Sequence, residues 1–410
     1  MSSKYSIGPV DLNEAVERIT AGIDPIEGTE VTGLANATGR IAAEDVSALV
    51  SLPPFPSSAM DGYALRSEDI QGNPPYELKL VGQSLAGRPF DGSPGVGEAV
   101  RIFTGAAMPQ GADTVVIQED CTATGEGVRI NTRPNAGDNV RCEGHDVGRG
   151  EIIVRRGQPL TPFSVGWLAA SGHESIAVSA RPRVAVFSTG DELQEPGSAL
   201  GPGQIYESNR HMLRGLLQQL PVEVTDLGRV ADDPDETIDA LQRAATQADA
   251  MITTGGVSVG DADFVADAVE SLGSLEVWRM NIKPGKPFAF GRVGSCLFFG
   301  LPGNPVSAAI TYLMIARPAL VRLCGAEAGE APSALARLTD PISHKPGREE
   351  FQRGRMRVSG GETTVSVTGD QSSNRLATFD KANCLIRIPK QAGSLAPGAT
   401  VEVLPLFGLI

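Results

Sequence analysis

The pattern of apolar and polar positions divides the chain into stretches of different texture. Residues 11–23 begin with Asp11, have Glu14 three positions later and then carry apolar residues at helical spacing, which predicts a capped helix. From about residue 51 to 146, short alternating runs are broken by Gly, Pro and Asn, which predicts a β-rich module. Similar runs return after residue 330 and predict a small C-terminal β-module.

Between residues 181 and 330, strand candidates alternate with helix candidates. The runs RVAVFST (183–189), ADAMITT (248–254) and CLFFG (296–300) have the length and composition of buried strands. The segment 305–323 has the composition of a long helix that opens on a proline. This alternation predicts an α/β domain whose mostly parallel sheet is covered by helices on both faces.

Composition excludes two classes of protein. Lys and Arg number 35 against 49 Asp and Glu, the net charge is −14, and no basic run is present, so we expect no nucleic-acid partner. No apolar run approaches a membrane span and the first residues lack a signal peptide's apolar core, so we expect a cytoplasmic protein without a membrane partner. The five cysteines are never spaced CxxC, which favours buried or idle thiols in a reducing compartment.

Candidate chemistry follows the predicted strands of the α/β domain. In open α/β sheets, ligands bind beyond the carboxyl ends of the strands. Five loops occupy such positions, and they share one rim if the strands lie side by side. Their notable residues are Thr189, Gly190, Asp191 and Glu192; Asp232 and Asp233; Gly255, Gly256, Ser258, Asp261 and Asp263; Lys283, Pro284, Gly285, Lys286 and Pro287; and Pro302, Gly303, Asn304 and Ser307.

The residues of this rim have mixed chemistry. Glycine-rich turns at helix starts expose N–H groups to phosphate or another oxyanion, and two lysines add point charges. Carboxylates are out of place beside phosphate alone, but they fit a Mg²⁺ that bridges them to phosphate oxygens. The rim therefore predicts a phosphorylated ligand with a divalent cation. Each motif alone also fits a structural turn or a helix cap, and only their joint occurrence favours a site.

Other candidates lie outside this domain. Asp61 stands in the Pro- and Ser-rich loop PPFPSSAMDGYAL, where a rigid turn is an equal alternative. His145 and Asp146 are adjacent, but no second His has metal-ligand spacing, so zinc catalysis is not predicted. Arg348, beside Pro346 and Gly347, is a candidate oxyanion clamp, although most arginines of its strand are expected to be solvated.

Together these motifs resemble the MoeA family, the molybdopterin molybdenumtransferases, which are related to the E domains of gephyrin and its plant counterpart. The matching runs, in the family's order, are PPFPSSAMDGYAL, FTGAAMPQGADTVV, STGDEL, SNRHML, DDP, TTGGVSVGDADF, IKPGKPFAFG, GLPGNPVSA and PGREEFQRG. They cover nearly the whole chain.

The resemblance implies a reaction and an architecture. Adenylated molybdopterin and molybdate would give molybdenum cofactor and AMP, with Mg²⁺ supporting the step. The implied fold is multidomain, with α/β and β modules. Its parts are a discontinuous linking domain I (1–50 and 147–180), a β-rich domain II (51–146), a MogA-like three-layer α/β domain III (181–330) and a C-terminal β-barrel domain IV (331–410). The family implies a homodimer whose site joins domain III of one subunit to domain II of the other.

By motif match, the resemblance assigns site residues. Asp61, Asp146, Glu192, Asp232, Asp263, Lys283 and Lys286 match catalytic positions, and Glu192, Asp232 and Asp263 are the candidate metal ligands. Substrate-binding candidates are Thr189, Gly190, Gly255, Gly256, Ser258, Pro287, Pro302, Asn304, Ser307, Arg348 and Ser373. Two departures from the family pattern are Ala266, where a Lys is frequent, and Arg279 in place of a Lys.

Alternative functions stay open at this point. The domain III signature also fits a molybdopterin adenylyltransferase or a nucleotide hydrolase, and some relatives are non-catalytic scaffolds. A MogA-type adenylyltransferase and apo-molybdoenzymes are the expected partners besides a second copy of the chain. No protein nucleophile is required, because positioning and charge neutralisation would supply most of the rate.

Overall fold

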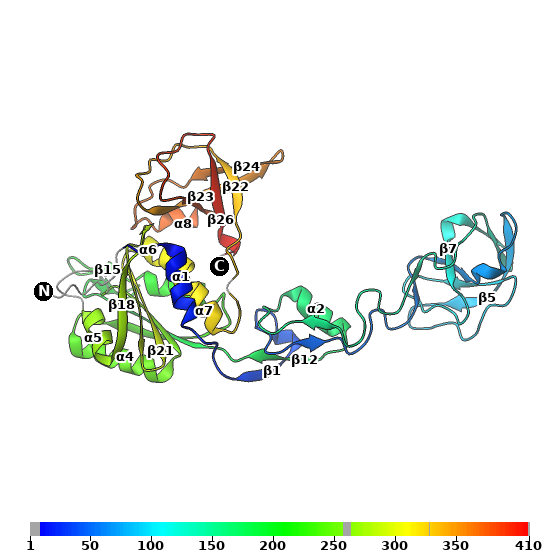
Figure 1. The fold of residues 1–410 in the computed structure, drawn as a ribbon, viewed down its shortest axis with the longest axis horizontal. Coiled ribbons are helices and arrows are strands. Elements are labelled where there is room, and N and C mark those ends of the chain that lie inside the picture. Colours follow the sequence, from blue (N-terminus) through cyan, green and yellow to red (C-terminus); the bar gives the residue numbers. More distant parts are fainter. Residues whose placement is uncertain (1–8, 257–263, 328, 409–410) are drawn as a thin grey trace.

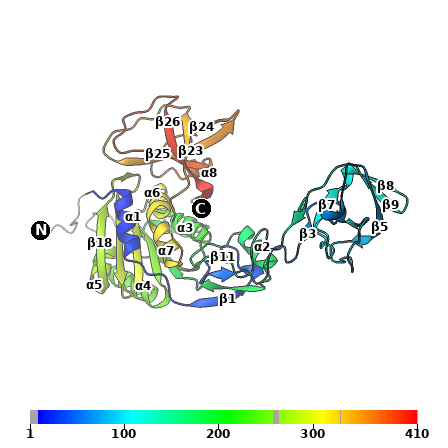
Figure 2. The same cartoon turned by 45° about the vertical axis from the view of Figure 1, so that its right-hand side comes forward.

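The computed structural model describes residues 9–256, 264–327 and 329–408. Figure 1 shows an extended body in which the α/β unit and the C-terminal barrel stack on each other at one end. A narrow linking module follows, and the β-rich module forms the opposite end. Figure 2, turned by 45°, shows the same separation between the two ends.

The α/β unit is built on a six-stranded sheet. Across the sheet, the strands are β16 (Glu223–Val230), β13 (Arg183–Thr189), β17 (Ala250–Thr254), β21 (Cys296–Leu301), β20 (Pro287–Val293) and β18 (Gly273–Arg279). The first four run parallel, and β20 is antiparallel to both of its neighbours. The predicted mostly parallel sheet is confirmed, although the sequence reading overlooked β20.

Helices cover both faces of this sheet. One face packs against α4 (Pro234–Gln247) and α5 (Phe264–Leu272) in a core that includes Phe187 and Phe298. The other face packs in a larger core against α3 (Asn209–Leu217), the segment 305–323 and α1 (Leu12–Ala21). The three-layer α/β fold is therefore confirmed, and the N-terminal helix α1 contributes its buried face to it. The short strands β14 (Leu193–Gln194) and β15 (Ile205–Tyr206) form a separate parallel pair.

The long helix is a core element with an irregular turn. It consists of α6 (Pro305–Thr311), a π-helical turn (Tyr312–Ala316) and α7 (Arg317–Leu323). By length and composition it could cross a membrane, which the sequence reading had missed. However, 72% of its apolar window is buried inside the structure, so the apolar composition reflects packing in the core.

Asp233 and Asp11 each stand directly before a helix, but only Asp233 caps its helix with its side chain. Asp233 caps α4, because its side chain accepts hydrogen bonds from the backbone N–H groups of Asp235 (2.9 Å) and Glu236 (3.0 Å). Asp11 stands at the N-cap position of α1 but makes no capping hydrogen bond. Its carboxylate instead contacts Lys390 and accepts a hydrogen bond from Asn281 at 2.9 Å. The predicted side-chain cap is therefore wrong, since a long-range cation competes for the carboxylate.

The β-rich and linking modules are made of short strands. The β-rich sheet has the order β7 (Thr114–Ile117), β4 (Gly62–Leu65), β6 (Glu98–Ile102), β5 (Tyr76–Ser84), β9 (Gly127–Ile130) and β8 (Cys121–Thr124). Three pairs of strands lead back to the α/β unit. They are β3 (Ser57–Ser58) with β10 (Val140–Arg141), β2 (Val46–Ser47) with β11 (Ile152–Val154), and β1 (Thr29–Gly33) with β12 (Ser175–Ser179). Helix α2 (Pro162–Ala170) begins at a capping box formed by Thr161 and Ser164.

The C-terminal module is a closed five-stranded barrel, as predicted. Its strands are β23 (Glu349–Ser359), β24 (Glu362–Val367), β22 (Ala334–Leu338), β26 (Thr400–Pro405) and β25 (Cys384–Ile388), and β25 pairs back to β23. A short helix, α8 (Ala377–Asp380), precedes β25. The two-residue strand β19 (Ile282–Lys283) of the α/β unit pairs in parallel with β23 and so joins the two modules.

Replacing Phe288 tests the importance of strand β20 for this fold. Phe288 is fully buried, and its ring centroid lies 6.3 Å from that of Trp278. We expect Phe288→Ala to lower the free energy of unfolding by about 3–5 kcal/mol, measured by urea denaturation followed through tryptophan fluorescence. Phe407, which is 75% exposed, is the control, and Phe407→Ala should change stability by less than about 0.5 kcal/mol. Equal effects of the two substitutions would contradict this account.

Candidate functional site

Five loops meet at one edge of the α/β sheet. Strand β20 is antiparallel to β21, and β18 is antiparallel to β20, so β18 points in the same direction as the four parallel strands. Arg279 at the end of β18 pairs with Pro287 at the start of β20, which brings the segment 280–286 to the carboxyl edge. The loops therefore share the rim expected from the sequence. Ser258, Asp261 and Asp263 lie outside the described residues.

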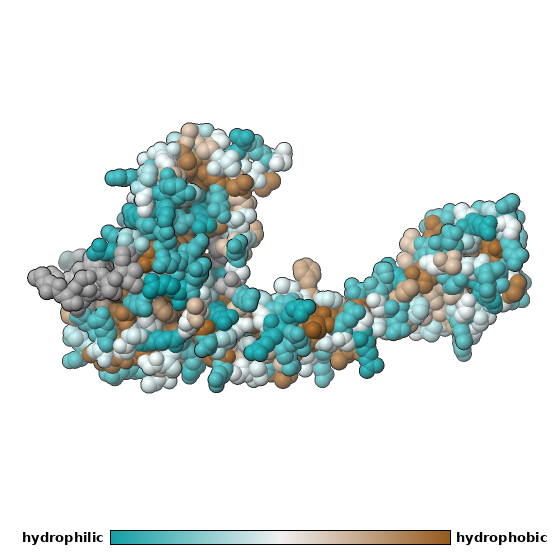
Figure 3. All heavy atoms as spheres, viewed as in Figure 1, coloured by the Kyte–Doolittle hydropathy of each residue, from teal (hydrophilic) through white to brown (hydrophobic). Residues whose placement is uncertain are grey.

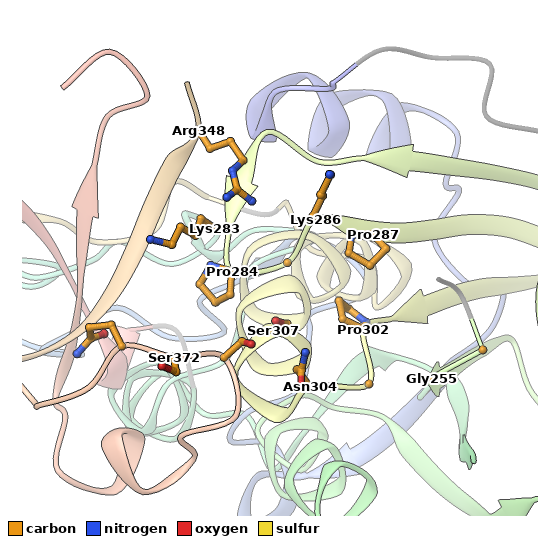
Figure 4. Close-up of a pocket in the computed structure, with 15 residues that line it drawn as sticks. Gly255, Lys283, Pro284, Lys286, Pro287, Pro302, Asn304, Ser307, Arg348 and Ser372 are labelled. Atoms are coloured by element: carbon orange, nitrogen blue, oxygen red, sulfur yellow. The ribbon is translucent and has the colours of Figure 1, made fainter. Parts of the chain in front are cut away.

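A cavity of about 450 Å³ opens between this edge and the C-terminal barrel (Figure 4). It brings together the candidates Gly255, Gly256, Lys283, Lys286, Pro287, Pro302, Asn304, Ser307, Arg348 and Ser373. Its remaining lining residues are Pro284, Gly285, Gly303, Gln371 and Ser372. Gln371 and Ser372 were missed, although their position beside Ser373 in the QSSNRL run was an available signal.

The cavity carries net positive charge. Lys283, Lys286 and Arg348 lie on one side of the opening in the view of Figure 4, with Asn304, Ser307 and Ser372 on the other. Lys283 Nζ lies 3.0 Å from Glu350 Oε1, so its charge is paired. Neither Lys286 nor Arg348 forms an ion pair with any described residue. Two unpaired cations beside hydroxyl and amide groups are suited to bind a small oxyanion.

A buried arginine shapes the barrel side of this cavity. The Arg353 guanidinium is fully buried and donates hydrogen bonds to Thr378 Oγ1 (3.0 Å), the Ser372 carbonyl (3.2 Å) and the Asp370 carbonyl (3.4 Å). Its backbone N–H donates to Gln371 Oε1 at 2.8 Å. Burial lowers the pKa of Arg353 to about 10. This residue, expected to be solvated, instead holds the loop 370–373 against the cavity.

The glycine loops of the edge pack closely against each other. A Cβ on Gly255 would lie 2.7 Å from the Thr189 carbonyl oxygen, and one on Gly256 would lie 2.9 Å from Thr189 Oγ1. Asn209 Nδ2 donates a hydrogen bond to the Gly303 carbonyl at 2.7 Å, which fixes the loop before α6. Thr189 Oγ1 is buried and has no hydrogen-bond partner within the described residues. Thr189, at the end of β13, therefore lies directly beside Gly255 and Gly256 of the cavity.

The candidate carboxylates lie at the other end of this edge. Asp232 Oδ2 accepts a hydrogen bond from the Asp191 N–H (3.2 Å), and Asp191 Oδ1 accepts one from the Asp232 N–H (3.3 Å). The Glu192 carboxylate folds back on Gly190, where a Cβ would lie 2.7 Å from Oε2. The edge from β16 to β20 spans four strand spacings, or about 19 Å. The candidate carboxylates and the candidate lysines therefore occupy opposite ends of one extended surface, and Arg229 Nη1 lies 3.8 Å from Asp191 Oδ1 at the carboxylate end.

The predicted metal ligands are only partly described by the structure. In the described ranges, no group of three or more His, Cys, Asp or Glu side chains is arranged to hold a metal ion. Glu192 is part of the loop 190–192 and folds back on Gly190, and Asp232 lies against the same loop through its hydrogen bond with Asp191. Asp263 falls outside the described residues. Asp191, absent from the predicted set, is the carboxylate that hydrogen-bonds with Asp232. The carboxylates of Asp191, Glu192 and Asp232 are exposed and offer oxygen ligands of the kind that Mg²⁺ prefers.

Asp61 and Asp146 lie far from this cavity within one chain. Asp61 Oδ1 accepts hydrogen bonds from the N–H and the hydroxyl of Thr104, both at 2.8 Å, and these bonds lower the pKa of Asp61. Asp146 lines a second cavity of about 460 Å³ with Phe55, Arg141 and His145 among others. Asp61 stands directly before β4 of the β-rich module, and Asp146 lies between β10 and β11, where that module joins the linking module. The β-rich module forms the end of the molecule opposite the α/β unit (Figures 1 and 2).

Comparison with known protein families shows which family this chain belongs to. Residues 10–172 match the MoeA N-terminal region (domains I and II), residues 185–322 a probable molybdopterin-binding domain, and residues 335–406 the MoeA C-terminal region (domain IV). The chain belongs to the MoeA family. The sequence resemblance and the multidomain fold that it implied are thereby confirmed.

Curated relatives share this arrangement along nearly their whole length. The chain is 40% identical to a molybdopterin molybdenumtransferase of Haemophilus influenzae over 387 residues, which cover 93% of this chain and 95% of the relative. It is 34% identical to a protein of the same name from Nostoc over 405 residues, covering 97% and 93%.

A solved structure of the molybdopterin biosynthesis MoeA protein from Pyrococcus horikoshii is also similar. It superposes with a TM-score of 0.82 at 29% identity and covers 97% of this chain and all of the other.

Substituting Gly255 tests the close packing of this MoeA edge. Gly255 has a φ of +87°, and a Cβ there would meet the Thr189 carbonyl, so Gly255→Ala is both strained and crowded. We expect a loss of about 1–3 kcal/mol in the free energy of unfolding, measured by urea denaturation. Gly33, with nothing within 4 Å of an added Cβ, is the control, and Gly33→Ala should cause no comparable loss. An equally stable Gly255→Ala variant would show that the edge can rearrange.

Proposed function

We propose that this chain is a molybdopterin molybdenumtransferase of molybdenum cofactor biosynthesis. It inserts molybdate into adenylated molybdopterin and yields molybdenum cofactor and AMP. The observation that carries this proposal is the cavity in which Lys283, Lys286 and Arg348 meet hydroxyl and amide groups at the carboxyl edge of a molybdopterin-binding domain. Its charge and donor chemistry suit a tetrahedral dianion.

The residues of the cavity hold the metal-containing substrate. Lys286 and Arg348, which have no ion pair among the described residues, balance the two charges of molybdate, and Lys283 donates hydrogen bonds from its paired ammonium. Ser307, from the sheet edge, and Ser373, from the barrel loop, supply hydroxyl groups to the same cavity. These groups orient molybdate beside the dithiolene of molybdopterin, so that positioning and charge neutralisation supply most of the rate.

The rest of the edge accommodates the adenylated end of the substrate. The edge is about 19 Å long, which suits an extended molecule with an anionic phosphate bridge. Glu192 and Asp232, together with Asp263, would hold Mg²⁺ there, and Asp191 adds a further oxygen donor. When bound, the ion supplies charge neutralisation at the phosphate bridge as AMP leaves.

No side chain is needed as a covalent nucleophile. Burial raises the pKa of Cys296 and Cys324 to about 12 and that of Cys384 to about 11, so these thiols stay protonated at neutral pH. Cys121 is partly buried, and burial raises its pKa to about 11. The chemistry therefore depends on binding and orientation of two anionic substrates.

We further propose a homodimer in which each site uses both subunits. Asp61 and Asp146 are functional candidates of the family resemblance, yet Asp61 lies in the β-rich module and Asp146 where that module joins the linking module, so neither belongs to the α/β unit or the barrel that form the cavity. A second copy offers a way to bring them to the cavity. Large apolar side chains of the linking module support this association, with Phe163 88% exposed and Ile152 and Leu49 about half exposed. Figure 3 shows apolar surface on this middle part of the molecule.

Two other functions receive less support. A nucleotide hydrolase acts on one phosphorylated substrate and an adenylyltransferase on two, but neither uses molybdate, which leaves the separate cationic cavity without a small oxyanion as its ligand. A scaffold would need neither the paired Lys283 nor the close-packed glycine loops. The proposal also includes a cytoplasmic location. In it, a MogA-type adenylyltransferase supplies the adenylated substrate, and apo-molybdoenzymes accept the product.

Release of AMP tests the function directly. With purified chain, adenylated molybdopterin and Mg²⁺, we expect AMP release to depend on added molybdate. Lys286→Ala should lower kcat/KM for molybdate about 10–100-fold, because a cation that faces the dianion is lost. Lys345→Ala is the matched control, since Lys345 is exposed and does not line the cavity. Release of AMP that is indifferent to molybdate would favour the hydrolase instead.

Mixing two inactive variants tests the shared site. Asp61→Asn alters the β-rich module and Lys286→Ala alters the cavity, so each homodimer contains only impaired sites. A mixed dimer has one site with both halves intact, so an equimolar mixture after subunit exchange should recover about a quarter of the wild-type activity. Activity no greater than that of the separate variants, despite demonstrated exchange, would contradict a site built from two subunits.

A further inference from the structure

We propose that Glu350 is a positioning residue for molybdate binding, because its buried carboxylate fixes Lys283 against the wall of the cavity. This inference rests on the proposed function. Glu350 does not line the cavity, and it acts only through the lysine that does.

The backbone brings the two residues together across a module boundary. Strand β19 of the α/β unit pairs in parallel with β23 of the barrel, and Lys283 stands directly opposite Glu350 in this register. Lys283 Nζ then reaches Glu350 Oε1 at 3.0 Å. The lysine side chain is 48% exposed, whereas the glutamate side chain is only 3% exposed. The ion pair therefore joins a solvent-facing ammonium to a fixed, buried anchor.

The anchor itself is held from several directions. Glu350 Oε2 accepts a hydrogen bond from His344 Nδ1 at 2.8 Å, and Oε1 accepts one from Gln352 Nε2 at 3.0 Å. His344 and Gln352 are also buried. Although burial raises the pKa of Glu350, the hydrogen bonds from His344, Gln352 and Lys283 outweigh it and lower the pKa overall. The carboxylate is thus ionised at neutral pH and has little freedom to move.

Such an anchor matters because a lysine side chain is flexible. An ammonium on four methylene groups loses rotamer freedom when it is ordered, and a partner that orders it beforehand removes this loss from the binding step. The pairing also neutralises one of the three cations of the cavity and leaves Lys286 and Arg348 to match a dianion. Glu350 thereby contributes both orientation and charge balance to the site.

A second ion pair across the same boundary separates this role from simple attachment of the barrel. Asp11, before α1, contacts Lys390 of the barrel, and neither residue lines the cavity. If Glu350 only attached the modules, the loss of either carboxylate would have similar consequences. If it positions Lys283, only the loss of Glu350 affects the kinetics with molybdate.

The experiment compares Glu350→Gln, Glu350→Asp and Asp11→Asn in the full chain. The KM for molybdate is measured through AMP release at saturating adenylated molybdopterin, and circular dichroism verifies folding. We expect both Glu350 variants to raise this KM about tenfold with a smaller change in kcat, because neither amide nor shortened carboxylate holds the ammonium in place. Asp11→Asn should leave the KM within about twofold of wild type. Glu350→Asp retains the charge and also serves if the Gln variant does not fold.

A double substitution shows whether the effect passes through the lysine. In a Lys283→Ala background, Glu350→Gln should cause no further rise in the KM for molybdate, since the side chain to be positioned is gone. A full additional rise in that background would overturn the proposal. An unchanged or lowered KM for Glu350→Gln, or a normal KM for Glu350→Asp, would also overturn it. Wild-type AMP release without molybdate dependence would instead refute the proposed function, so the two failures are distinguishable.

Discussion

The arrangement of the site depends on the direction of one strand, β20. Because β20 runs against both neighbours, β18 points the same way as the parallel strands, and its following loop emerges at their carboxyl edge. If β18 and β20 each ran in the opposite direction, the loop between them, with Lys283 and Lys286, would lie at the far edge of the sheet, away from Asn304 and Ser307. Strand direction therefore places the two lysines at the same edge as Asn304, Ser307 and the glycine loops.

The second determinant is the contact between the α/β unit and the barrel. One wall of the cavity is the sheet edge, and the other is formed by Arg348, directly before β23, and by Gln371, Ser372 and Ser373. Arg353 of β23 holds the loop 370–373, while the pairing of β19 with β23 joins the two walls. A buried guanidinium is expensive to desolvate, so its hydrogen bonds to main-chain carbonyls stabilise one loop geometry strongly. The cavity is thus a property of two modules and not of either alone.

Local patterns predicted the elements and the edge loops, but not the contacts between distant segments. Apolar runs and glycine-rich turns indicated the parallel strands and the residues of the edge loops that line the cavity, because strand ends follow directly from periodicity, whereas Ser373 was predicted only through the family resemblance. Nothing local distinguishes buried Arg353 from exposed Arg355 on the same strand, or from exposed Arg348 just before it, since burial depends on how the barrel closes. For the same reason, the pairing of Asp11 with Lys390 appears only in the folded chain.

The position of molybdate bound to the protein tests the central claim most directly. Crystals soaked with molybdate, with diffraction data collected near the molybdenum absorption edge, locate the metal by its anomalous signal. We predict the strongest peak in the cavity between Lys286, Arg348 and Ser373. A peak in the second cavity beside Arg141 and His145, with no signal at the sheet edge, would contradict the account.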